Sequence, residues 1–262
     1  MKIVVCIKQV PDTAEVKLDP KTNTLIRDGV PSIINPDDKA GIEVALRLKE
    51  QVGGTVTLVC MGPPQADVAL REALAMGCDD AVLISGREFG GSDTLATSTI
   101  IAAGIKTLDY DVIITGRQAI DGDTAQVGPQ IAEHLGIPQV SYAEELTADG
   151  DSLIVKRQFE DRYQKIRVKT PCLITDLSEI AEPRYMTVGG TIDAYAKEIK
   201  VLGFEELKDK LNPEHIGLKG SPTNVVKSFT KQAKGAGEVL KDASADDAVK
   251  AIIAKMEEKH II

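Results

Sequence analysis

The stretch DVIITGRQAIDGDTAQVGPQIAEHLG, residues 111–136, decides the fold that we expect for this chain. Its apolar start, residues 111–115, predicts a buried parallel strand, and residues 125–135 have the apolar spacing of an amphipathic helix. A long polar loop with two glycines joins them. In open α/β sheets, ligands bind where the carboxyl end of a strand leads into a helix. The stretch therefore predicts an α/β fold with a binding site at this loop.

The end of the loop has the composition of a phosphate site. Thr124 is expected to cap the helix, and the positive end of the helix dipole favours an anion there. Gly128 is expected to let a ligand or a neighbouring strand come close. The backbone N–H groups expected to face a phosphate are those of Ala125, Gln126 and Val127.

Two observations keep a plainer interpretation open. The loop lacks the G-x-G-x-x-G spacing of a dinucleotide fingerprint, so on spacing alone an ordinary strand-to-helix connection is an equal alternative. Asp121 and Asp123 also argue against a bare phosphate site, unless they bind ribose hydroxyls or a backbone N–H.

The rest of the chain repeats the alternation of strand and helix. This order predicts a mostly parallel, doubly wound, Rossmann-like sheet with helices on both faces. Alternating polar and apolar residues over 153–157 and 164–169 add an antiparallel hairpin, and turn residues within 16–27 predict a smaller one. The expected strands are 3–7, 56–60, 81–84, 112–115 and 172–175, and the expected helices are 37–51, 65–76, 94–108 and 125–135.

The pattern changes after residue 177. We expect a nucleotide- or flavin-binding α/β domain over residues 1–177, and over 178–262 an extended partner-binding arm that ends in an amphipathic helix, 246–259. Residues 178–240 are rich in glycine and poor in long apolar runs. Such a segment either buries its apolar residues on a partner or packs as a plain intramolecular arm.

Composition excludes several classes of function. The formal net charge of −9 leaves no basic face for nucleic-acid phosphates. We expect no membrane span and no signal peptide, and hence a cytoplasmic protein with its four cysteines reduced and buried. Three scattered histidines predict no metal site, and no side chain has an evident catalytic role.

Five stretches, in the same order, resemble the β subunit of electron transfer flavoproteins. The loop GRQAIDGDTAQVGPQIAEHLG is similar to the adenine-nucleotide loop of that family. The others resemble its amino terminus, two further nucleotide contacts and the start of its partner-docking segment: they are KIVVCIKQVPD at 2–12, INPDD at 34–38, MGPP at 61–64 and EPRY at 182–185.

The resemblance implies roles for residues outside the loop. Asn35 and Asp38 are expected to hold the ribose or adenine edge, and Cys6 and Met61 to contact the adenine. It also implies a larger α subunit that carries a redox-active FAD.

The resemblance further implies that residues 184–194 dock on an acyl-CoA or hydroxy-acid dehydrogenase or reductase, with Arg184 and Tyr185 at the start of this segment. Val188 stands where the family has an anchoring leucine, so the anchor here is smaller. The identity of the docked enzyme stays open.

Two subtypes of the family differ in the bound nucleotide. One binds AMP structurally; the other binds a second FAD, takes hydride from NADH and bifurcates electrons to ferredoxin and to the FAD of the α subunit. The stretches VPDT at 10–13 and PSIINP at 31–36 resemble the second subtype. Gly90, Gly91 and Thr94 lie in a loop where backbone can approach a flavin or nicotinamide, although Ser92 or Asp93 can equally make it an ordinary helix cap.

Three functions follow as hypotheses. The first is a bifurcating, FAD-binding subunit, and the second an AMP-binding subunit without chemistry of its own. The third is a regulatory nucleotide-binding protein of the same fold. Because only 3% of the residues are aromatic, ring stacking is not expected to hold a flavin.

Overall fold

The computed structural model describes residues 1–12, 31–223 and 239–262, together with 226, 235 and 237. Two compact units divide the chain, Met1–Val225 and Val226–Ile262. The hairpin predicted within 16–27 lies outside the described residues, as does part of the 10–13 motif.

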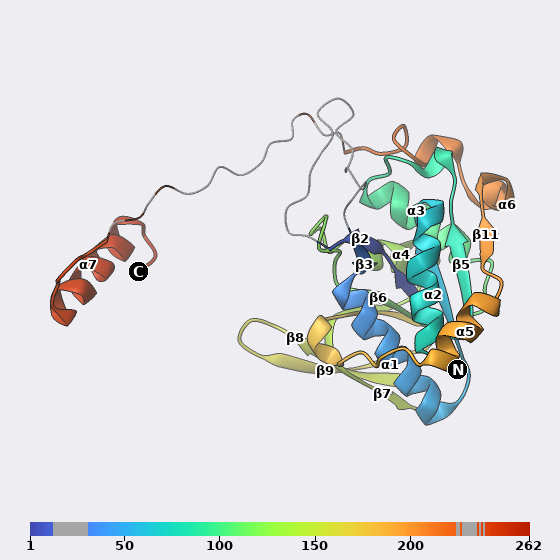
Figure 1. Cartoon of the computed structure of the whole chain (residues 1–262), viewed down its shortest axis with the longest axis horizontal. Helices are drawn as coiled ribbons and strands as arrows, with labels where there is room; N and C mark the ends of the chain where they lie inside the picture. The colour runs from blue at the N-terminus through green and yellow to red at the C-terminus, as the bar shows by residue number, and fades with distance from the viewer. Residues whose placement is uncertain (13–30, 224–225, 227–234, 236, 238) are drawn as a thin grey trace. The chain divides into compact units, whose positions relative to one another are not determined.

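A nine-stranded sheet organises the first unit, in the order β11-β5-β4-β1-β6-β10-β7-β8-β9. In Figure 1, β5 and β11 lie toward one edge of this sheet and β7, β8 and β9 toward the other. All pairs from β11 to β7 are parallel, and β7-β8-β9 is antiparallel. The predicted mostly parallel α/β fold is therefore confirmed. The strands are β1 (Lys2–Ile7), β4 (Thr55–Met61), β5 (Asp80–Ile84), β6 (Val112–Gly116), β7 (Gln139–Asp149), β8 (Ser152–Gln158), β9 (Tyr163–Lys169), β10 (Cys172–Asp176) and β11 (Lys200–Leu202). A separate small pair joins β2 (Gln9–Pro11) to β3 (Ser32–Ile34).

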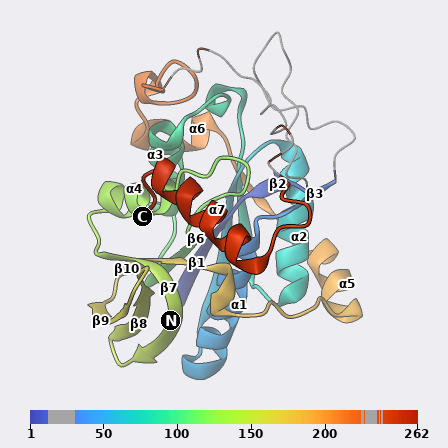
Figure 2. The same ribbon diagram turned by 90° about the vertical axis from the view of Figure 1, so that its left-hand side faces the viewer.

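Helices cover both faces of the sheet. Helices α1 (Pro36–Val52) and α2 (Asp67–Met76) share one apolar core, and α3 (Thr94–Ile105) and α4 (Val127–Leu135) share the other. Figure 2 shows the two pairs on opposite sides of the strands. Both cores contain side chains that are fully buried, such as Ile42 on the first face and Ile100 on the second. This burial is the main stabilising contribution to the fold.

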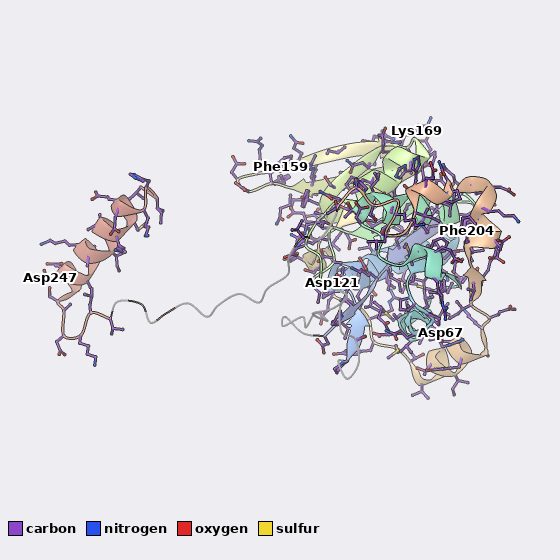
Figure 3. The ribbon with its side chains drawn as sticks, turned by 90° about the horizontal axis from the view of Figure 1, so that it is seen from above. Asp67, Asp121, Phe159, Lys169, Phe204 and Asp247 are labelled. Atoms are coloured by element: carbon purple, nitrogen blue, oxygen red, sulfur yellow. The ribbon has the colours of Figure 1, made fainter. Side chains whose placement is uncertain are left out.

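Strand β7 was not predicted. Its sequence, QVSYAEELTAD, loses strict alternation at a bulge, where the register with both neighbouring strands shifts around Ala143. Tyr142 at this bulge has a φ of 59°. The antiparallel hairpin of β8 and β9 is confirmed; Figure 3 labels Phe159 at its turn and Lys169 at the end of β9.

Residues 178–223 pack on the α/β domain. Strand β11 extends the sheet beside β5, and α6 (Phe204–Leu207) follows it. Helix α5 (Val188–Ala196) lies on α2, where Arg71 donates to the backbone oxygens of Ala194 at 2.7 Å and Lys197 at 3.3 Å. In return, Lys197 Nζ donates to the backbone oxygens of Cys78 and Asp79, just beyond the end of α2, at 2.9 Å each. The predicted boundary after residue 177 remains a prediction, and so does the partner-binding role of the segment that follows it.

The second unit contains the predicted amphipathic helix, α7 (Ala245–Glu258). Ser244 caps it by accepting from the backbone N–H of Asp247 at 3.2 Å. None of its residues is buried, and Val249, Ile252 and Ile253 are exposed.

The four cysteines form no disulfide and all are buried, as predicted. Over the described ranges, no helix is long and apolar enough to span a membrane, and no cluster of metal-ligating side chains occurs.

Candidate functional site

A cavity of about 390 Å³ opens at the carboxyl ends of the central strands β1 and β6. The amino ends of α3 and α4 flank it, so it occupies the place where doubly wound sheets bind ligands. Ten of the residues predicted to bind a cofactor line this one cavity: Cys6, Asp38, Met61, Thr94, Asp123, Thr124, Ala125, Gln126, Val127 and Gly128.

The loop before α4 differs from its prediction in one respect. Helix α4 begins at Val127, two residues later than expected, and Gln126 rather than Thr124 occupies the cap position, without a side-chain cap hydrogen bond. The cause is backbone conformation: Ala125 has a φ of 52°, which cannot continue a helix. The prediction that Thr124 caps the helix is therefore wrong.

Gly128 allows α4 to pack closely against the sheet. It is buried, and a Cβ atom there would lie 2.5 Å from Thr115 Oγ1 and 2.8 Å from Thr175 Cγ2. Of the two roles expected for this glycine, the structure supports the close approach of neighbouring strands. The absence of a side chain brings the first turn of α4 against β6 and β10, directly beside the cavity.

Asn35 and Asp121 hold the loop in place. The Asn35 amide donates to the backbone oxygen of Gln118 at 2.8 Å and accepts from the N–H of Ile120 at 3.1 Å. Asp121 Oδ1 lies 2.6 Å from Lys8 Nζ. Neither Asn35 nor Asp121 lines the cavity. Their observed contacts fasten the loop to the end of β1, which positions the residues that do line it.

Asp38 joins two strand ends beneath the cavity. Its carboxylate accepts from the backbone N–H of Lys8 at 2.7 Å and of Gly116 at 3.0 Å. Burial raises the pKa of Asp38 to about 7, although hydrogen bonds from Asn35, Lys8 and Gly116 act in the opposite direction. Burial also raises the pKa of the Cys6 thiol, so Cys6 presents a neutral, polarisable surface.

The predicted glycine loop before α3 is already occupied by the chain itself. Gly90 accepts from the N–H of Leu218 at 3.1 Å, and Gly91, with a φ of 74°, lies against the Leu218 side chain. Neither glycine lines the cavity. Asp93 caps α3 by accepting from the N–H of Ala96 at 3.0 Å, so one of the two caps expected for this helix is present. Thr94 does reach the cavity and donates to Gln126 Oε1 at 2.8 Å.

Sequence reasoning missed the two cations of the cavity, Lys8 and Arg117. Lys8 directly follows the end of β1, and Arg117 directly follows the end of β6. A cation just after the carboxyl end of a central strand is the signal that would have found them. Within the described part of the chain no aromatic ring lines the cavity.

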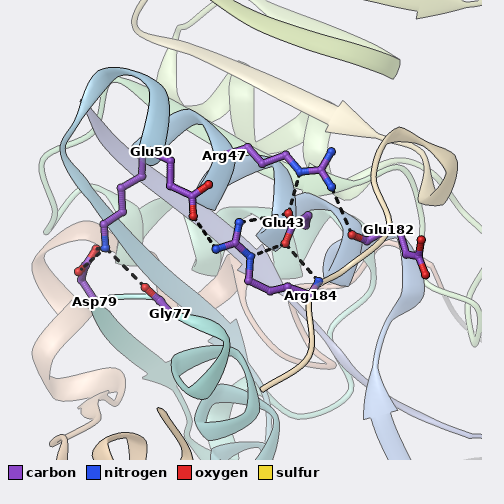
Figure 4. Close-up of polar contacts among 8 residues, drawn as sticks. Glu43, Arg47, Glu50, Gly77, Asp79, Glu182 and Arg184 are labelled. Carbon is purple, nitrogen blue, oxygen red and sulfur yellow. Dashed lines mark hydrogen bonds and ion pairs between the residues drawn. The ribbon is translucent and has the colours of Figure 1, made fainter. Parts of the chain in front are cut away.

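The predicted docking residues divide into one that is bound and two that are free to meet another molecule. Arg184 Nε lies 2.7 Å from Glu43 Oε2, and Arg184 Nη1 lies 2.6 Å from Glu50 Oε1 (Figure 4). Tyr185 and Val188 are exposed, at 94% and 82%. Arg184 thus ties the start of the segment to α1, and the apolar side chains that follow face outward.

Comparison with known proteins agrees with this geometry. The electron transfer flavoprotein domain matches residues 22–206. The chain belongs to the electron transfer flavoprotein family. It is 57% identical over 263 residues to the electron transfer flavoprotein subunit beta of Clostridium acetobutylicum, covering 100% of both chains. Among its other relatives are the caffeyl-CoA reductase-Etf complex subunit CarD of Acetobacterium woodii, 52% identical, and the acryloyl-CoA reductase electron transfer subunit gamma of Anaerotignum propionicum, 53% identical, each with 100% of both chains covered. The chain is therefore an electron transfer flavoprotein β subunit.

Proposed function

We propose that this β subunit binds FAD in the cavity at the ends of β1 and β6 and acts in flavin-based electron bifurcation. In this role the FAD accepts hydride from NADH and passes one electron to ferredoxin and the other, through the FAD of an α subunit, to a partner dehydrogenase or reductase. The observation that carries the proposal is the convergence of ten predicted cofactor residues on one cavity.

The residues present fit a nucleotide. Val127 and Gly128 supply N–H groups in the first turn of α4, where no intrahelical acceptor is available, and the helix dipole favours an anion. Lys8 supplies a cation at the cavity wall. A volume of about 390 Å³ lies low in the range of roughly 300–1,000 Å³ for small-molecule sites. It suits the nucleotide half of a dinucleotide, with the flavin ring extending past the cavity mouth.

In this proposal the protein contributes to the chemistry by positioning the cofactor. Asn35 and the Lys8–Asp121 pair hold the loop, and Gly128 sets the depth of α4, so the donors are fixed before ligand arrives. Cys6 and Met61 close the apolar side of the cavity. The chain thereby orients a cofactor whose own ring carries the redox chemistry.

The alternative is a subunit that binds AMP as a structural element. It would use the same N–H donors and cavity, and the cavity volume favours it over a whole FAD inside the described walls. Two relatives whose names refer to CoA reductases favour the first proposal, since they associate this type of subunit with reductase complexes.

The partners in this proposal are an electron transfer flavoprotein α subunit, an acyl-CoA or hydroxy-acid dehydrogenase or reductase, and ferredoxin, in the cytoplasm. The exposed Tyr185 and Val188 are proposed to contact the dehydrogenase, on a segment that Arg184 anchors.

A cofactor count tests the proposal. The purified two-subunit complex is expected to release two FAD and to show rapid bleaching of one of them with NADH. One FAD and one AMP per complex would reject the bifurcating role and establish the AMP-binding alternative. A complex without any nucleotide in this subunit would reject both.

A further inference from the structure

The cavity assigned to a nucleotide carries more acidic than basic side chains. Among the described residues, the acidic side chains that line it are Asp38, Asp93 and Asp123, and the basic ones are Lys8 and Arg117. A phosphate-bearing ligand adds negative charge to surroundings that are already negative, and like charges at short range oppose one another. Binding is easier if the site loses negative charge as the ligand enters.

The two cations are partly neutralised before any ligand binds. Lys8 Nζ is 2.6 Å from Asp121 Oδ1, and Arg117 Nε is 3.7 Å from Asp37 Oδ2. The lining cations therefore cannot offset the whole charge of a diphosphate.

Asp176 lies behind the cavity as a second buried carboxyl group. It is 0% exposed at the end of β10, and neither carboxyl oxygen has a hydrogen-bond partner among the described residues. A Cβ atom added to Gly41 of α1 would lie 2.9 Å from its Oδ1, so α1 closes over it. Because an ionised carboxylate without partners is very costly to bury, burial favours the protonated form of Asp176. Burial, with further contributions from Asp38 and Asp37, raises its pKa well above the usual value.

Asp38 is another buried carboxyl group with a raised pKa, and it lines the cavity. The groups that face it come from four elements: the Lys8 N–H and the Cys6 thiol from β1, Asn35 and Asp37 at the start of α1, the Gly116 N–H from β6 and the Asp176 carboxyl from β10. Among the described residues, the groups that most affect the pKa of Asp38 include no cationic side chain. With a pKa of about 7, Asp38 is divided between its two protonation states near neutral pH.

We propose that Asp38 takes up a proton when the cavity binds a phosphate-bearing nucleotide, so that the protein itself offsets part of the ligand's charge. The inference rests on the proposed function for the place of the ligand. Ligand charge makes the ionised form of Asp38 less favourable, and by linkage protonated Asp38 makes ligand binding more favourable. Nucleotide affinity therefore falls as pH rises through the titration range of free Asp38.

Calorimetric titration with FAD tests the inference on the full-length chain after removal of bound nucleotide. FAD is a suitable probe because its diphosphate keeps a constant charge between pH 6 and 9. We expect the dissociation constant to rise above pH 7 by up to about tenfold per pH unit, the limit for one linked proton. In two buffers of different ionisation enthalpy, the apparent binding enthalpies at pH 8 are expected to differ, with uptake of up to about one proton.

Two matched substitutions locate the proton. Asp38→Asn is expected to remove the pH dependence. Asp93→Asn changes another cavity acid while keeping a side chain that can cap α3. Although burial acts to raise the pKa of Asp93, hydrogen bonds hold it below the usual value, so Asp93 is ionised throughout this pH range. The Asp93 variant should therefore bind with a different affinity but the same pH slope.

Equal affinity of the unsubstituted chain from pH 6 to 9, with no buffer dependence, would overturn the inference even if Asp38→Asn fails to fold. A wild-type slope in a folded Asp38→Asn variant would overturn it as well. Strong binding without pH dependence would leave the proposed function intact, whereas no binding at any pH would contradict both.

Discussion

Arg184 Nε donates to Glu43 Oε2 over 2.7 Å, and it joins the start of the proposed docking segment to the middle of α1 across 141 positions of sequence. The Glu43 side chain is only 5% exposed, whereas that of Arg184 is 33% exposed. Arg47 binds the same carboxylate at 2.7 Å, and the backbone N–H of Arg184 approaches it at 3.2 Å. The pair fixes where the exposed residues after it begin.

Arg184→Ala is expected to lower the free energy of unfolding by about 1–3 kcal/mol, because a buried carboxylate loses donors while Arg47 remains. Burial acts to raise the pKa of Glu43, but hydrogen bonds from Arg184 and Arg47 outweigh it and hold the pKa below the ordinary value. A lowered folded-state pKa gives stability that is present above the unfolded-state pKa and lost as pH falls through the folded value. The difference between the two proteins in urea unfolding should therefore shrink below about pH 4.

The control for this measurement is Arg162→Ala, which removes an exposed arginine that pairs with Asp161 at 3.5 Å. It is expected to change stability by less than about 0.5 kcal/mol. Equal losses in the two variants would contradict a special contribution from Arg184.

Gly128→Ala is expected to destabilise the protein by about 1–3 kcal/mol, because the new methyl group meets Thr115 and Thr175 and pushes α4 from the sheet. Nucleotide binding should weaken with it, since the N–H donors of α4 shift. Gly122→Ala is the matched control: nothing lies within 4 Å of its added Cβ. Thermal unfolding and nucleotide titration of the two variants check the prediction. An unchanged Gly128→Ala protein would show that α4 is not packed as described.

Lys8→Met is expected to weaken nucleotide binding about tenfold and to reduce its dependence on salt, because it removes a cation from the cavity wall. Lys2→Met alters a lysine at the other end of the same strand, paired with Asp109 at 2.7 Å on the surface. Its nucleotide affinity should match that of the unsubstituted protein. Equilibrium titration at low and high salt compares the two, and equal effects would argue against a role for Lys8.

Val188→Asp is expected to weaken association with the proposed partner dehydrogenase by about tenfold or more while leaving the bound nucleotide unchanged, since it places a charge in the proposed apolar contact. Val68→Asp provides the comparison. Val68 is also exposed, at 59%, and lies in the first turn of α2, where an acidic residue is tolerated. Surface-binding kinetics with the isolated dehydrogenase distinguish the variants; similar losses in both would place the docking surface elsewhere.

The sequence was a good guide to the regular parts of the fold. Strands such as β1 and β6 are continuous apolar runs, because helices cover both of their faces. Strand β7 was missed because its outer part is half exposed and its bulge at Tyr142 interrupts the period of two. The start of α4 was placed early because the left-handed conformation of Ala125 leaves no mark in the sequence.

The candidate site, like the fold, could be predicted only in part from the sequence. Neighbouring residues on one loop, such as Asp123 and Gln126, were found because spacing places them together. The burial of Asp38 and Asp176 was not foreseen, since it depends on how α1 lies across β6 and β10. The engagement of Arg184 by Glu43 likewise arises only from the tertiary fold.

Helices α5 and α2 are joined in both directions: Arg71 of α2 donates to the backbone oxygens of Ala194 and Lys197, and Lys197 Nζ donates to the backbone oxygens of Cys78 and Asp79 just beyond α2. Arg71 is itself held by Asp67 at 2.8 Å, and Gly190 packs against the backbone oxygen of Ala75 without room for a side chain. A protein bound to the outer side of α5 would consequently keep a fixed orientation relative to the central strands. Any swing that shortens the path of an electron would then have to take place at a joint outside this pair of helices.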